Sequence, residues 1–197
     1  MFTLAFDTTV NYCSIALFDG YSELDKFEQP MAFGQAEVLL PQIAALLQKH
    51  NLQFKDLSLA IVCTGPGSFT GVRASIAAAR AFALACPETT VCGVSAFDAY
   101  AADFAQNELS EVNTVLIETK RDDFYVQHYD GKLNKIQPAS TAFYEDIIRF
   151  LSGKKVTLAG DGAERFLSKP SGLSLHTVKF QNNPPIDKLA LAGIKMF

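Results

Sequence analysis

The chain has 197 residues, of which 49% are hydrophobic and 19% are charged. This apolar content is enough to bury a sizeable core, so it excludes a disordered chain and predicts one domain or two small lobes. Its 17 basic and 21 acidic residues give a net charge of −4. A protein that binds nucleic acid alone usually has a basic excess, so if this chain acts on RNA we expect the contact to run through a partner.

The sequence predicts a cytoplasmic protein that makes no membrane contact. Residues 1–7 lack the basic leader of a secretory signal. The most apolar later stretch, residues 74–86, contains Arg80 and is therefore not expected to span a membrane. The cysteines form no Cys-x-x-Cys pair, and we interpret them as reduced core thiols rather than disulfide or metal ligands: Cys13, Cys63, Cys86 and Cys92.

The first half of the chain predicts a meander of three strands followed by alternating helices and strands. Pro87 is expected to stop one of these helices, and Pro41 to kink another. We assign this half to an N-terminal lobe, residues 1–107. Its expected elements, in order, are strands at 2–7, 12–18 and 21–28, a helix at 35–50, a strand at 58–64, a helix at 72–86, a strand at 89–93 and a helix at 95–107.

A smaller C-terminal lobe, residues 108–197, is expected to repeat this order in reduced form. Glu118 ends its first strand as Asp7 ends the first strand of the chain. The order predicts an α/β fold of the actin, Hsp70 and hexokinase (ASKHA) type, with a duplicated mixed sheet plus helices. The expected elements are strands at 112–118 and 123–129, a helix at 142–152, a strand at 155–159, a short helix after Gly160-Asp161-Gly162 and a closing helix after Pro185.

The most informative stretch is the loop Gly65-Pro66-Gly67-Ser68-Phe69-Thr70-Gly71-Val72-Arg73, between a buried strand and a helix. Glycine permits positive φ and close backbone approach, and the N–H groups that begin a helix attract anions. The loop is therefore either a turn that lets strand and helix pack closely or a phosphate-binding site. It is not a Walker loop, because no Gly-Lys-Ser/Thr follows.

This loop resembles the signature of the TsaB family, also called YeaZ. The segments 4–9 with 13–17, 37–41 and 93–95 resemble the family's opening strands, its first helix and the strand end before its third helix. The resemblance covers about residues 1–105. It is weaker beyond, because Glu118-Thr119-Lys120 stands where the family commonly has Asp-Ala-Arg.

The resemblance implies a non-catalytic, dimerising scaffold subunit of a tRNA modification complex. TsaB-like proteins pair with TsaD, a catalytic relative of the same fold. With the ATPase TsaE, they transfer a threonylcarbamoyl group to adenosine 37 of tRNA. The catalytic relatives carry a metal site on a His-x-x-x-His helix, whereas Ala96 and Tyr100 occupy the corresponding positions here. We therefore expect no metal and no catalytic residue, and the missing histidines argue against a metallopeptidase.

Asp7-Thr8-Thr9 is a second stretch that suggests a ligand. In sugar kinases and actin-like ATPases, an acidic residue and hydroxyls at this turn touch metal-bound phosphate. Asp7 alternatively caps the strand end by bonding N–H groups of the turn. No cofactor is expected, and weak binding of ATP or ADP at Asp7, Thr8, Thr9, Gly65 and Gly67 is the alternative. A small phosphotransferase or ATPase of the sugar-kinase fold is accordingly the competing function.

Two helices have more apolar or small surface than one sheet requires. Burial between the sheet and its neighbours is one interpretation. The interpretation that we favour is a partner interface, which predicts a homodimer in isolation and a heterodimer with a TsaD-like protein. Lys154, Lys155, Arg165 and Lys169 are interpreted as solvated surface. The expected interface residues are Val38, Leu39, Gln42, Ala74, Ala77, Ala78 and Ala81.

Overall fold

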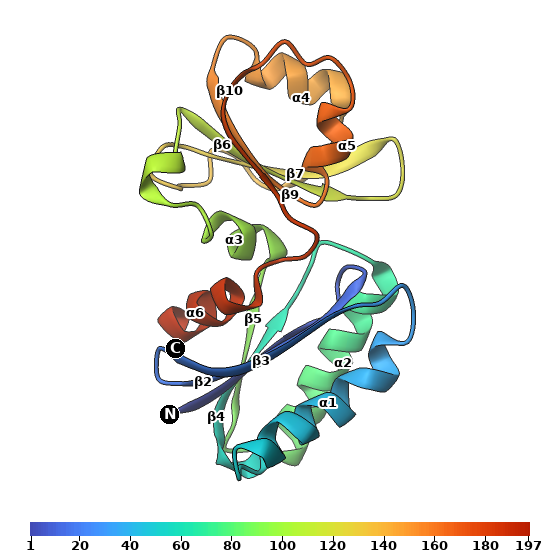
Figure 1. Ribbon diagram of the computed structural model, residues 1–197, viewed down its shortest axis with the longest axis vertical. Helices are drawn as coiled ribbons and strands as arrows, with labels where there is room; N and C mark the ends of the chain where they lie inside the picture. The colour runs from blue at the N-terminus through green and yellow to red at the C-terminus, as the bar shows by residue number, and fades with distance from the viewer. The chain divides into compact units, whose positions relative to one another are not determined.

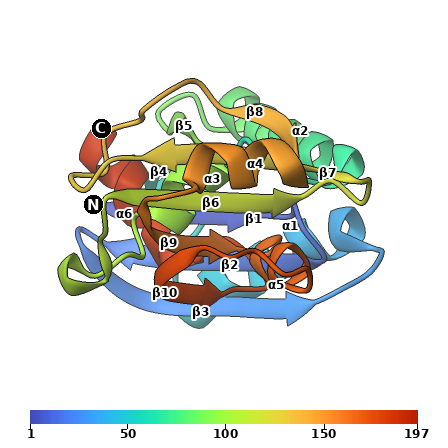
Figure 2. The same cartoon turned by 90° about the horizontal axis from the view of Figure 1, so that it is seen from above.

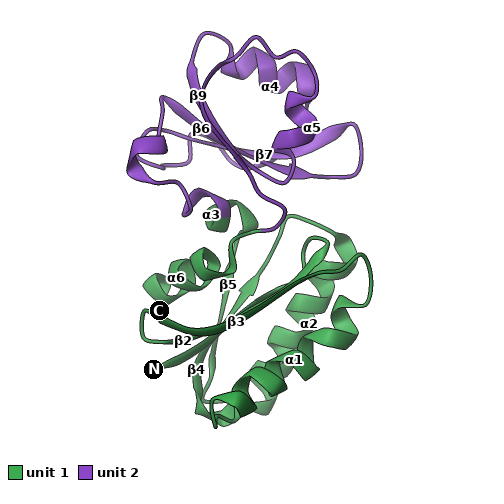
Figure 3. Cartoon of the chain, viewed as in Figure 1, with its two compact units in different colours: residues 1–99, 184–197 green, residues 100–183 purple.

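The computed structural model describes residues 1–197, and the chain divides into two compact units. Unit 1 comprises residues 1–99 and 184–197, and unit 2 comprises residues 100–183 (Figure 3). This division differs from the predicted lobes 1–107 and 108–197 in two respects. The chain passes from unit 1 to unit 2 at residue 100 rather than at residue 108. The closing helix belongs to unit 1 rather than to unit 2, because its apolar face packs on the sheet of unit 1.

Unit 1 is built on a five-stranded mixed sheet with the strand order β3-β2-β1-β4-β5 (Figures 1 and 2). The first three strands form the predicted antiparallel meander, and β4 and β5 continue the sheet in parallel. Buried apolar residues run through β1, β2 and β4, as a central sheet requires. The strands are β1 (Phe2–Asp7), β2 (Tyr12–Asp19), β3 (Ser22–Pro30), β4 (Leu57–Cys63) and β5 (Thr90–Val94).

Helices cover both faces of this sheet (Figure 1). The helices α1 (Gln35–Lys49) and α2 (Phe69–Ala85) lie on one face, and α6 (Ile186–Met196) lies on the other. Gly193 of α6 sits directly on Ile61, because a Cβ there would lie 2.6 Å from the Ile61 side chain. The core under α1 and α2 includes Leu4, Phe6, Ile15, Leu39, Ile43, Ala78 and Phe82.

Unit 2 repeats the sheet of unit 1 strand for strand, with the order β10-β9-β6-β7-β8. A three-stranded meander is again followed by two parallel strands, which confirms the predicted duplication. The reduction lies in the helices, since α4 (Tyr144–Leu151) has 8 residues and α5 (Ala163–Leu167) has 5. The strands are β6 (Val112–Glu118), β7 (Asp123–Tyr129), β8 (Ser140–Phe143), β9 (Lys155–Gly160) and β10 (Ser174–Phe180).

Several element bounds differ from the sequence prediction. The α2 helix begins at Phe69 rather than at 72, because Ser68 serves as its N-cap and accepts a hydrogen bond from Gly71 N at 3.5 Å. The helix α3 (Ala96–Ala101) ends well before residue 107. Two short 3₁₀ turns, η1 (Phe54–Asp56) and η2 (Gln106–Glu108), complete the elements. No helix has both the length and the hydropathy to cross a bilayer.

Candidate functional site

The signature loop packs directly on the turn that follows β1. The Ser68 N–H donates to the Thr9 carbonyl oxygen at 2.6 Å. A Cβ atom at Gly67 would lie 2.3 Å from that oxygen, and one at Gly71 would lie 1.8 Å from the Thr8 oxygen. No side chain fits in such gaps, so both positions require glycine. This contact between two backbone segments supports the packing interpretation of the loop.

The Thr8 side chain is bound to α2. Its Oγ1 donates to the Gly71 carbonyl oxygen at 2.8 Å and lies 2.8 Å from Ser75 Oγ. The Thr8 N–H donates to the same Ser75 oxygen at 3.1 Å. Thr8 and Ser75 are fully buried, so the polar groups at this point of the turn are satisfied within the chain.

Asp7 is buried at the end of β1, with 1% of its surface exposed. Its Oδ1 accepts a hydrogen bond from Thr9 N at 2.7 Å, as a capping residue would, and Oδ2 has no hydrogen-bond partner. Burial raises the pKa of Asp7, and burial together with the Asp7 charge raises the pKa of the Cys63 thiol beside it. Burial therefore disfavours the charged form of this carboxyl group.

Gly65 connects the loop to the start of α3. Its carbonyl oxygen accepts hydrogen bonds from Ala96 N at 2.8 Å and from Ser95 Oγ at 3.3 Å, and its φ of +84° favours glycine. Ala96 and Tyr100, which the sequence resemblance led us to expect at the positions of the relatives' histidines, are both fully buried. No group of three His, Cys, Asp or Glu side chains in the chain is arranged to hold a metal ion.

Unit 2 has the corresponding loop at Gly160-Asp161-Gly162, and it makes the same kind of backbone contact. A Cβ atom at Gly160 would lie 2.1 Å from the Leu116 oxygen, and the Gly162 N–H donates to that oxygen at 3.0 Å. The acidic residue differs, because Glu118 Oε1 pairs with Arg165 Nε at 2.6 Å. The guanidinium carbon of Arg165 also lies 3.7 Å from the centroid of the Phe124 ring.

The predicted interface residues fall into three groups. Leu39 and Ala78 are buried in the core of unit 1, which corrects their assignment to a partner surface. Ala77 and Ala81 are exposed on α2. Val38, Gln42 and Ala74 are half-buried at the borders between these two sets. The apolar bands of both helices are so wide that their periodicity did not distinguish the side that faces the core.

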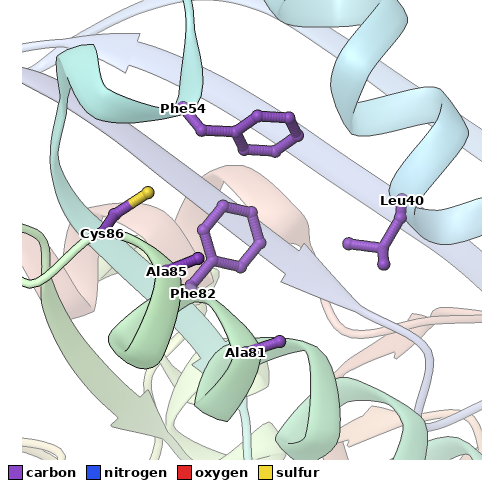
Figure 4. A pocket seen from close by; sticks show the side chains of 6 residues that line it. All are labelled: Leu40, Phe54, Ala81, Phe82, Ala85 and Cys86. Carbon is purple, nitrogen blue, oxygen red and sulfur yellow. The ribbon is translucent and has the colours of Figure 1, made fainter.

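A hollow of about 210 Å³ lies between α1, α2 and η1 (Figure 4). Its lining is apolar and includes Leu40, which is 44% exposed. A second hollow adjoins it, shares Phe54 and Cys86, and extends along α1 to Ala44 and Leu47. Sequence reasoning missed Leu40, Phe54 and Cys86, although the wide apolar band of α1 already contained Leu40. The first hollow is lined by Leu40, Phe54, Ala81, Phe82, Ala85 and Cys86.

Comparison with known families gives one matching family model, TsaD, described as tRNA N6-adenosine threonylcarbamoyltransferase, over residues 34–185. The curated proteins named "tRNA threonylcarbamoyladenosine biosynthesis protein TsaB" from Escherichia coli and from Buchnera aphidicola are 30% and 26% identical to this chain. The E. coli alignment covers 87% of the chain and 77% of the relative, and the B. aphidicola alignment covers 83% and 76%.

Solved structures show the same fold. YeaZ from Pseudomonas aeruginosa matches with a TM-score of 0.81 at 24% identity, over 100% of this chain and 93% of that one. An inorganic polyphosphate/ATP-glucomannokinase from Arthrobacter matches with a TM-score of 0.55 at 12% identity, over 99% of this chain and 98% of that one. With the duplicated sheet, these matches confirm the predicted actin and hexokinase type of fold. The chain therefore belongs to the TsaB (YeaZ) family, within the wider family that the threonylcarbamoyltransferase model describes.

Proposed function

We propose that this chain is the non-catalytic TsaB-type subunit of the machinery that makes threonylcarbamoyladenosine at position 37 of tRNA. Its catalytic partner is a TsaD-type protein, and a TsaE-type ATPase joins the same complex. The role in threonylcarbamoyladenosine biosynthesis follows from the family of the chain. The alternative of a small phosphotransferase is not favoured, because curated proteins similar to this chain are named TsaB proteins.

One observation carries the non-catalytic part of the proposal. The turn at 7–9, where related folds bind metal-bound phosphate, is packed against the loop 65–71 of the same chain. Asp7 is 1% exposed, and the N–H and hydroxyl groups around it bind other groups of unit 1. A substrate could reach this carboxyl group only if the loop moved away from the turn.

The same packing bears on cofactors. We propose that the chain uses no nucleotide of its own, because ATP or ADP at residues 7–9 would have to displace the Ser68–Thr9 hydrogen bond. Equilibrium dialysis with ATP and Mg²⁺ tests this directly. We expect no binding below about 1 mM nucleotide, a weak-affinity limit near −4 kcal/mol. Binding in the micromolar range would overturn this part of the proposal.

The apolar hollows between α1 and α2 are the proposed docking surface. They expose Leu40 and Ala81 to solvent on a helical face that the chain leaves uncovered. Anchor side chains that enter such pockets contribute most of the free energy of association at protein interfaces. We propose that the TsaD-type protein supplies these side chains, and that a second copy of this chain occupies the surface when the partner is absent.

Reconstitution tests the proposed function. The chain is mixed with the TsaD-type and TsaE-type proteins of its organism, tRNA and the threonylcarbamoyl adenylate donor, and each component is omitted in turn. We expect modified tRNA only when this chain and the TsaD-type protein are both present. Product formed by this chain alone, or undiminished product without it, would reject the proposal.

A substitution in the hollow tests the docking surface. Ala81→Trp should fill the hollow and weaken binding to the TsaD-type protein by tenfold or more, with little effect on folding because Ala81 is exposed. Ala139→Trp, at an exposed position of unit 2, is the matched control. Isothermal titration calorimetry gives both affinities. Equal affinities for the two variants would place the interface elsewhere.

A further inference from the structure

The outward face of α2 has two positive charges and no negative charge. Arg73 and Arg80 are both exposed, and the helix contains no Asp or Glu. They are seven residues apart, which puts them on one face and about 10 Å apart along the helix axis. The Arg73 guanidinium lies 5.2 Å from the centroid of the Phe69 ring. Neither arginine forms an ion pair within this chain.

Apart from the exposed Thr70, the rest of this face is apolar. Phe69 is 75% exposed, Leu84 is 84% exposed, and Ala77 and Ala81 lie between them. A partner that covers these side chains must also cover Arg73 and Arg80. Covering a guanidinium without a carboxylate opposite it leaves a desolvated charge, which strongly disfavours association. The two arginines therefore restrict which partners this apolar face accepts.

We propose that Arg73 and Arg80 are specificity-determining residues that select a protein partner whose docking face carries carboxylates. This inference rests on the proposed function, in which this face binds the TsaD-type protein. Arginine pairs with carboxylates in a bidentate geometry, so two such pairs would fix the register of the partner along α2 as well as its identity. The partner's carboxylates should be spaced by about two helical turns, like the arginines.

A second copy of this chain does not offer the carboxylates that Arg73 and Arg80 require. The exposed parts of α1 and α2 contain one carboxylate, Glu37, and α2 itself contains none. A symmetric dimer through α2 would gather four arginines and no more than two carboxylates in one interface. Like charges in an interface disfavour the wrong partner. The same residues that attract the acidic partner therefore make self-association through this face weaker than binding of that partner, so a second copy occupies the face only when the partner is absent.

The observations favour a protein over an RNA as the occupant. Phosphate groups would pair with the arginines, but they make no favourable contact with the exposed Leu84 and the alanines beside it. The net charge of −4 also opposes an approach by RNA. Binding of tRNA to the isolated chain is accordingly one arm of the test.

The test compares two double variants that remove equal charge. Arg73→Gln/Arg80→Gln changes the proposed face, and Lys155→Gln/Lys195→Gln changes exposed lysines on β9 and α6. For the first variant we expect binding to the TsaD-type protein to weaken at least tenfold while self-association tightens severalfold. For the second we expect both constants to stay within twofold of wild type. Calorimetry measures the first constant, and analytical ultracentrifugation measures the second.

Salt gives a measurement that needs no variant. Raising ionic strength from 0.1 to 1 M shortens the screening length from about 10 to about 3 Å. We expect it to weaken the wild-type complex with the TsaD-type protein and to tighten self-association. These opposite shifts are the signature of selection by charge, since screening weakens the attraction between unlike charges and also weakens the repulsion between like charges.

Three outcomes would overturn the inference. A complex that forms with wild-type affinity in the arginine variant and is indifferent to salt rejects selection by charge but leaves the proposed function standing. Failure of the wild-type chain to bind the TsaD-type protein at any salt rejects the proposed function and the inference together. Binding of tRNA that the arginine variant loses would identify RNA, not a protein, as the occupant of the face.

Discussion

An acidic residue ends the first strand of the sheet in each unit, but its surroundings differ between the two units. In unit 1, Asp7 ends β1 and is buried with no cation beside it. In unit 2, Glu118 ends β6, is about a quarter exposed and pairs with Arg165. Both strand ends support a glycine loop by backbone contact. The comparison shows that an acid at this position is not by itself a sign of metal or phosphate chemistry.

The largest effect is expected where the loop of unit 1 touches its turn. Gly71→Ala would place a methyl group 1.8 Å from the Thr8 oxygen, and neither backbone segment can yield easily. We expect a loss of about 3 kcal/mol or more of unfolding free energy, measured by urea denaturation. Gly153→Ala is the control, because its Cβ meets open space and only its φ of +77° is unfavourable, at a cost of about 1 kcal/mol. Equal effects would contradict the proposed contact.

The second largest effect is a loss of folding stability at acid pH, and it comes from His128 in unit 2. His128 on β7 is buried, lies 2.8 Å from Thr114 Oγ1 through Nδ1, and stacks on Phe150. Burial, aided by the charge of Lys154, lowers the pKa of His128 from 6.5 to about 4. The unfolded chain then binds the proton more tightly, so stability should fall as pH drops from 6.5 to 4. The full loss is about 3 kcal/mol, at about 1.4 kcal/mol per pH unit.

His128→Asn isolates this contribution, because asparagine can keep a polar group near the position of Nδ1 without titrating. The unfolding free energies of both proteins at pH 7 and pH 4 give the comparison. We expect the variant to lose about 3 kcal/mol less than wild type between these two values. An identical loss in both proteins would show that His128 is not the group responsible.

The smallest effects are expected from substitutions of the two acidic residues, Asp7 and Glu118. These substitutions should change the free energy of unfolding in opposite directions. The raised pKa of Asp7 means that its ionisation disfavours the folded state, so stability falls as pH rises above the ordinary value of 3.8 and through the raised pKa. Asp7→Asn, whose Oδ1 can still accept from Thr9 N, should stabilise the chain by about 1 kcal/mol at pH 8 and less at pH 4.

Glu118→Gln breaks the ion pair with Arg165 and should destabilise the chain by up to about 1 kcal/mol, since the pair is partly exposed. Chemical denaturation of both variants and the wild type at pH 4 and pH 8 measures whether each substitution raises or lowers the free energy of unfolding. Destabilisation by Asp7→Asn at pH 8 would show that the ionised carboxylate is needed there, and would reopen the metal-site interpretation.

The sequence predicted those features that depend on local pattern. Strands β6 and β7 lie at the predicted residues, and the loop spacing identified the family. Strands β8 and β10 were missed because they are edge strands with mostly exposed or half-buried residues, so hydrophobic alternation is weak. Leu39 and Ala78 were misplaced because α1 and α2 are apolar on both sides, and only packing decides which side faces the sheet.

The return of α6 to unit 1 has a consequence for how the protein is made. Residues 100–183 form one uninterrupted stretch, so unit 2 has all its elements once they leave the ribosome. Most of unit 1 is synthesised first, yet Ile61 is covered only after Gly193 of α6 has been synthesised. Until α6 leaves the ribosome, the face of the unit 1 sheet that α6 covers is exposed to solvent. Nascent chains stalled before residue 184 should therefore recruit chaperones more strongly than chains that include α6.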